Sequence, residues 1–117
     1  MIKPLLTTLT VLAILTGCST PPKQIYRDQP LVAQVKKGMS KQQVLDIGGP
    51  PLSVSKRSVN PGSCLDYRFT KDGQQQAYHV SLDAADKVDH KGFVNCAGRE
   101  HADQTAKEPQ QHSGGGY

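Results

Sequence analysis

A short apolar run near the amino terminus limits what the rest of this chain can be. Leu5 to Leu15 follows the single basic residue Lys3 and precedes the small pair Thr16-Gly17. The run is about 11 residues long, whereas a helix that spans a membrane needs about 20. The layout is typical of a secretory signal that is removed after export. We therefore expect residues 1–17 to be cleaved, so that the remaining 100 residues must supply the fold.

The segment that ends this run reads Leu15-Thr16-Gly17-Cys18 and resembles the bacterial lipobox. In that motif the peptidase cuts before an obligatory cysteine, here between Gly17 and Cys18, and the Cys18 thiol carries the lipid. Several acyl chains anchor a protein stably where one chain anchors it only marginally. Ser19, rather than aspartate, after the cysteine favours the outer membrane, with the domain facing the periplasm. The alternative is an ordinary signal peptide with a chance cysteine.

The charge of the mature chain is only mildly basic. Removing Lys3 leaves 13 basic and 10 acidic residues. Seven of the basic residues lie in residues 23–57, which hold only two acidic residues, so this segment could form a basic face. Anionic lipid headgroups and plain solvent are the interpretations that fit an exported protein. Nucleic-acid binding by residues 23–57 is the alternative from another class, and it predicts a cytoplasmic, unlipidated protein.

Cys64 and Cys96 remain as a pair once Cys18 carries lipid. An oxidising periplasm favours a disulfide between them. A metal or redox site is the rival interpretation, but it calls for a closer spacing of the CxxC type than this chain has. We therefore predict the Cys64–Cys96 bond.

Residues 18–30 carry three prolines among polar side chains, which predicts an extended, lipidated tether. The folded domain is predicted to occupy residues 31–96. A first short helix should contain Leu31, Val32 and Val35 and end at Gly38.

A second short helix is predicted over residues 41–47. Ser40 and Gln43 have the spacing of a capping box, in which each side chain pairs with the other residue's backbone N–H. Met39 and Val44 can form the accompanying hydrophobic staple. Two glycines and two prolines follow, and they should end this helix.

The middle of the chain shows the period-two alternation of half-buried strands. One strand should turn Leu65, Tyr67 and Phe69 inward, and the next should turn Tyr78, Val80 and Leu82 inward. An Asp-Gly pair at residues 72–73 predicts the hairpin turn between them. A third strand should run from Lys87 to about His90, while residues 52–58 form either an edge strand or an extended arm. The expected fold is α+β, with two short N-terminal helices packed on a three-stranded antiparallel sheet.

The predicted disulfide requires a further bend. A straight last strand would carry Cys96 away from Cys64, yet bonded cysteines have α-carbons within about 7 Å of each other. We therefore expect the chain to bend at Lys91-Gly92. Residues 97–117 offer almost nothing apolar to bury, so they are expected to form a disordered polar tail.

A family resemblance rests on the helix region. Lys37-Gly38-Met39-Ser40, then Val44, then Gly49-Pro50 resemble the signature of the SmpA/OmlA superfamily of small outer-membrane lipoproteins, to which the barrel-assembly component BamE belongs. Within it, the two later cysteines and the Asp-Gly turn are similar to the branch of osmotically inducible lipoproteins. The resemblance implies a structural role for the motif and a role for the protein in envelope integrity under osmotic stress. Membership in the barrel-assembly machinery is the alternative.

The sequence offers little to an enzyme. His79, His90, His101 and His112 recur at intervals of eleven residues, but they do not share a predicted helical face. We expect no catalytic residue, metal or cofactor. The expected partners are membrane lipid through Cys18 and unidentified envelope proteins.

Overall fold

The computed structural model describes residues 20–107. Its helices and strands, in chain order, are α1 (Pro22–Ile25), α2 (Pro30–Gln34), α3 (Lys41–Gly48), β1 (Ser53–Lys56), β2 (Ser63–Lys71), β3 (Gln74–Leu82), β4 (Val88–Gly92) and α4 (Cys96–Lys107). The four strands form one antiparallel sheet in the order β1-β2-β3-β4. The class α+β is therefore confirmed, and the sheet has four strands where three were predicted.

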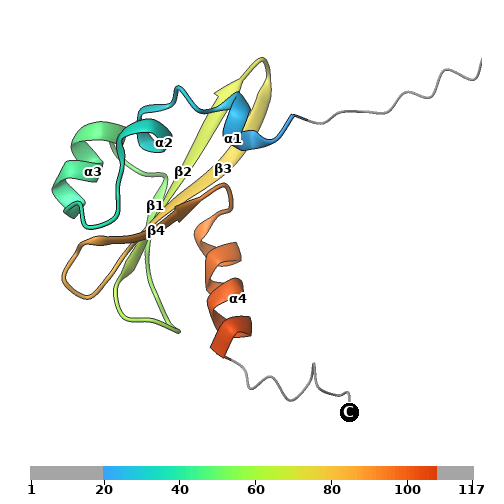
Figure 1. The fold of residues 1–117 in the computed structure, drawn as a ribbon. Helices are drawn as coiled ribbons and strands as arrows, with labels where there is room; N and C mark the ends of the chain where they lie inside the picture. The colour runs from blue at the N-terminus through green and yellow to red at the C-terminus, as the bar shows by residue number, and fades with distance from the viewer. Residues whose placement is uncertain (1–19, 108–117) are drawn as a thin grey trace, which may run out of the picture.

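The sheet separates two layers of helices (Figure 1). On one face α1, α2 and α3 cover an apolar core, and on the other face lies α4. The strand alternation explains this arrangement, because successive side chains point to opposite faces. The residues predicted to point inward are all buried on the first face: Leu65, Tyr67, Phe69, Tyr78, Val80 and Leu82.

The hairpin between β2 and β3 has the predicted Asp-Gly turn. Asp72 and Gly73 have φ values of 52° and 77°, and the strand pairing continues to Lys71 and Gln74 on either side. Left-handed conformations at both central residues match the right-handed twist of the strands.

The additional strand is β1, which pairs with the first half of β2. All four of its residues are exposed. The strand therefore lacks the pattern of a half-buried strand, and its pairing with β2 depends on main-chain hydrogen bonds. This pairing decides between the two alternatives for residues 52–58 in favour of an edge strand.

The predicted tether is partly folded. Residues 22–25 form α1, and Tyr26 is buried with its ring centroid 5.6 Å from that of Phe69. The extended-tether prediction is thus wrong from Pro22 onward, because it gave no weight to a lone aromatic residue among polar ones. The first predicted helix is also shorter than expected, since α2 gives way to extended backbone at Val35. Gly38, with φ +91°, instead shapes the turn before Ser40.

The predicted disordered tail is wrong for the part that can be described. Residues 96–107 form α4, which is capped by Asn95, whose side-chain oxygen accepts from the Gly98 N–H at 2.8 Å. The helix is nearly devoid of buried apolar side chains and buries Cys96 and Asp103 instead. Residues 108–117 lie outside the described part of the chain.

Candidate interaction groove

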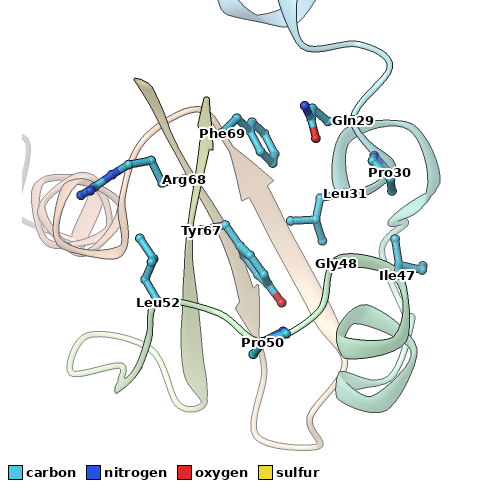
Figure 2. A pocket seen from close by; sticks show the side chains of 10 residues that line it. All are labelled: Gln29, Pro30, Leu31, Ile47, Gly48, Pro50, Leu52, Tyr67, Arg68 and Phe69. Carbon is cyan, nitrogen blue, oxygen red and sulfur yellow. The ribbon is translucent and has the colours of Figure 1, made fainter. Parts of the chain in front are cut away.

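A groove of about 380 Å³ lies between the sheet and helices α2 and α3 (Figure 2). Its walls are mainly apolar and come from the start of α2, the end of α3, the connection to β1 and the second half of β2. The lining residues are Gln29, Pro30, Leu31, Ile47, Gly48, Pro50, Leu52, Tyr67, Arg68 and Phe69.

Local contacts shape the groove. The Tyr67 hydroxyl donates a hydrogen bond to the Gly49 carbonyl at 3.0 Å, which ties the end of α3 to β2. Burial raises the pKa of Tyr67 above its ordinary value, so the hydroxyl remains a donor into the alkaline range. Gly48 lets α2 approach closely, because a Cβ there would collide with the Leu31 side chain. The groove therefore depends on the glycines that end α3.

The capping box predicted for α3 is present. The Ser40 hydroxyl accepts from the Gln43 N–H at 3.2 Å, and the Gln43 side chain accepts from the Ser40 N–H at 2.9 Å. Val44 is fully buried in the core, and Met39 packs at its margin. These motif residues build α3 and so position one wall of the groove. Gly17 and Cys18 lie outside the described residues.

The opposite face of the sheet is held by a disulfide. Cys64 in β2 and Cys96 at the start of α4 are bonded, with their α-carbons 5.8 Å apart. The prediction is confirmed, although β4 continues through Gly92 and the chain bends two residues later than expected, at Phe93 and Val94. The Asp66 carboxylate accepts from the Cys96 N–H at 2.7 Å beside the bond.

A buried ion cluster lies next to this disulfide and was not predicted. Arg57 is 6% exposed, and its guanidinium contacts Asp89 at 2.7 Å and Asp103 at 3.3 Å. Asp103 is itself 4% exposed and also pairs with Arg99 at 2.7 Å. Arg57 is thus removed from any basic face that residues 23–57 could form. Sequence spacing could not reveal the cluster, because its members come from three separate segments.

Two histidines meet on the same face. The Nδ1 atom of fully buried His79 lies 2.9 Å from the Val94 carbonyl oxygen, and its Nε2 atom lies 2.9 Å from Nδ1 of His90. Because a carbonyl can only accept, Nδ1 of His79 must carry the hydrogen. His90 must then donate to His79 when both rings are neutral. The regular histidine spacing thus brings together one pair, while His101 stays exposed on α4.

This histidine pair predicts a loss of stability in acid. Burial is the largest cause that lowers the pKa of both His79 and His90, and the nearby Arg99 charge lowers them further. The unfolded chain therefore binds protons at a higher pH than the folded chain does. We expect the free energy of unfolding to decrease as the pH falls below about 6.5.

Urea unfolding midpoints measured between pH 7.5 and pH 5 would check this expectation. The decrease should be smaller in His79→Gln, whereas His101→Gln should behave as the wild type. An equal pH dependence in all three proteins would contradict the role of the pair.

The structure places no three metal-ligating side chains together within residues 20–107. Among the same residues, no helix is long and apolar enough to cross a membrane.

Comparison with known proteins identifies the family. The sequence profile of the outer membrane protein assembly factor BamE domain matches residues 25–92. The chain belongs to the BamE family. The matched region begins within α1 and ends with β4, so it contains the groove but not α4.

Relatives within the BamE family agree over most of the chain. The osmotically inducible putative lipoprotein OsmE of Escherichia coli K12 is 36% identical over 107 residues, which cover 88% of this chain and 94% of the relative. The OsmE protein of Escherichia coli O157:H7 matches to the same extent. A crystal structure of a putative osmotically inducible lipoprotein OsmE has a TM-score of 0.71 at 44% identity and covers 76% of this chain and 94% of that one. The chain is therefore a BamE-family protein similar to OsmE, in an outer-membrane lipoprotein family.

Proposed function

We propose that this protein is a non-catalytic lipoprotein, anchored to the outer membrane through Cys18, that faces the periplasm and contributes to envelope integrity under osmotic stress. The observation that carries the proposal is the match to osmotically inducible lipoproteins across most of the chain. The lipobox and the fold support it together, because α1 begins only four residues after Cys18. Lipid at Cys18 would hold the domain directly at the membrane.

The groove is the surface that we propose for contacts with other envelope proteins. Its walls present buried apolar side chains, and Leu52 at its rim is 64% exposed. Apolar surface of this kind, rimmed by polar residues, marks sites of protein interaction more often than plain solvated surface does. Apart from Arg68, the lining side chains provide an amide, a phenol, a phenyl ring and aliphatic groups, which suit binding better than catalysis.

The anchor predicts a specific labelling result. Cells given radioactive palmitate should label the wild-type protein, and Cys18→Ala should lose the label because it removes the thiol that takes the lipid. Cys64→Ala/Cys96→Ala is the matched control and should remain labelled. An unlabelled wild-type protein would contradict the lipoprotein proposal and favour the cytoplasmic, nucleic-acid-binding alternative.

The physiological role calls for a separate measurement. Cells that lack the protein should leak more of a periplasmic enzyme after an osmotic upshift. Wild-type protein should restore retention, whereas unanchored Cys18→Ala should not. Equal leakage with and without the protein would exclude a role in envelope integrity under that stress.

A second candidate is an accessory role in outer-membrane barrel assembly, which the BamE-domain match favours. Purification from crosslinked envelopes would separate the two. Recovery of barrel-assembly subunits would support the accessory role, and their absence would count against it.

A further inference from the structure

The outer edge of β2 is only half covered. β1 pairs with Ser63 to Asp66, but β2 continues to Lys71. Within residues 20–107, the second half of β2 therefore has β3 on one side and no strand on the other. This uncovered stretch borders the groove, whose lining includes Tyr67, Arg68 and Phe69.

The strand register shows which main-chain groups face the gap. Lys71 and Gln74 form the last pair before the two-residue turn, so the main-chain groups of Lys71 bond to β3. The same holds for every second residue before it, beginning with Phe69 and Tyr67. The residues between them point toward β1, as the Asp66 carbonyl shows by accepting from the Leu52 N–H at 2.7 Å. The N–H and C=O groups of Arg68 and Thr70 must face the same side. Within residues 20–107 no group bonds to them.

The sequence explains why β1 stops short of this position. Continuing the register from Ser53 and Asp66 would place Pro51 opposite Arg68. Proline has no N–H to donate to a neighbouring strand. Pro51 therefore prevents this chain from filling the gap with its own β1.

The gap has room for one more strand, with the edge of β2 on one side and the start of α2 on the other. Figure 2 shows the Arg68 side chain pointing away from the groove, so Arg68 contributes its main chain to the lining. Gln29 and Pro30, at the start of α2, lie across from it, and apolar side chains form the floor. At about 3.4 Å per residue, the five uncovered residues of β2 match about 17 Å of extended chain.

We infer that this gap is a docking slot for an extended segment of another polypeptide, which adds to the outer edge of β2 in line with β1. The inference rests on the proposed function, because it names the kind of envelope partner that the groove accepts. Addition of a strand to an open edge gains affinity from main-chain hydrogen bonds and specificity from side-chain pockets. Free main-chain donors and acceptors at alternate residues are what an extended segment pairs with.

Charge narrows the choice of occupant. Arg68 on the uncovered half of β2 is exposed and has no ion pair within residues 20–107, so an acidic side chain beside it in the bound segment is favoured. The Lys71 ammonium already donates to the Ile25 carbonyl at 3.1 Å. A second copy of this chain would offer its exposed edge strand β1, which carries Lys56 and no acidic side chain to pair with Arg68. The occupant is therefore an extended, acidic and partly apolar segment of a different protein.

The test uses the full-length protein in intact envelopes, with a photoreactive residue in place of Gln29. In this background Thr70→Pro removes one N–H from the slot but leaves the bonds between β2 and β3 intact. Val54→Pro is the matched control, because the Val54 N–H also points outward from the sheet edge but lies outside the slot. Circular dichroism of both variants would establish that they fold.

We expect crosslinks from position 29 to another protein, with a yield at least tenfold lower in Thr70→Pro and unchanged in Val54→Pro. In the isolated complex, the amide hydrogens of Arg68 and Thr70 should exchange at least tenfold more slowly than in the free protein. Absence of crosslinks, equal loss in both variants or unchanged exchange would overturn the slot. So would crosslinks to residues 1–19 or 108–117 of the same chain, or to a second copy.

A photoreactive residue at Val94, which is exposed away from the slot, separates this result from the proposed function. Crosslinks to envelope proteins from position 94 alone would overturn the slot and leave the proposed function standing.

Discussion

Replacing Cys64 and Cys96 together by alanine should lower the free energy of unfolding by about 3.5 kcal/mol, on the chain-entropy estimate for a loop of this length. The bond joins two residues that are 32 positions apart in the sequence and connects the start of α4 to β2. Without it, α4 must be held by polar contacts alone, because Cys96 and Asp103 are its only buried residues within the described chain. Urea unfolding followed by circular dichroism would measure the loss.

The control for this experiment is Gln104→Ala, an exposed substitution in the same helix, which should change stability by less than about 0.5 kcal/mol. Reducing the wild-type disulfide should reproduce the effect of the double variant. A loss smaller than about 1 kcal/mol would contradict the chain-entropy estimate. It would show that the unfolded chain without the bond is already nearly as restricted as the unfolded chain with it.

Replacing Arg57 by methionine should destabilise the protein by about 3 kcal/mol, as expected when one partner of a buried ion pair is removed. The substitution leaves Asp103, which is 4% exposed, with Arg99 as its remaining cation. It also leaves the Leu82 carbonyl without the hydrogen bond that it accepts from Arg57 at 3.2 Å. Thermal and urea unfolding would both report the loss.

A double-mutant cycle makes the Arg57 prediction specific. Arg57→Met/Asp103→Leu should recover part of the stability, because it leaves no unpaired charge between these two positions. Arg68→Met is the matched control, since Arg68 is exposed and has no ion pair within the described residues. Additive losses from Arg57→Met and Asp103→Leu would exclude coupling through the buried pair.

The parts of the fold that the sequence predicts are those whose signals are local. β2 and β3 show an alternation that burial of one face requires, and the capping box needs only Ser40 and Gln43. The disulfide follows from counting cysteines in a chain that the sequence predicts to be exported. Each of these inferences uses residues that are close in sequence or of a rare type.

The parts that could not be predicted depend on distant polar contacts. α4 has few apolar residues to bury, and its docking depends on Arg57, which lies 46 residues before Asp103. β1 is exposed throughout and forms because β2 offers main-chain partners. The groove depends on where β1 ends. The sequence could not show this, because it does not reveal which residues of β2 lie opposite the prolines before β1.

Whether α4 is covalently attached to the sheet depends on the redox conditions of the compartment in which the chain folds. A thiol pair stays reduced in the cytoplasm and oxidises in the periplasm. In the proposed export, the chain would therefore lack the bond between Cys64 and Cys96 before translocation, and α4 would be held only by its polar contacts. Under the proposed export, the chain would gain the full stability of its fold only after it has crossed the membrane.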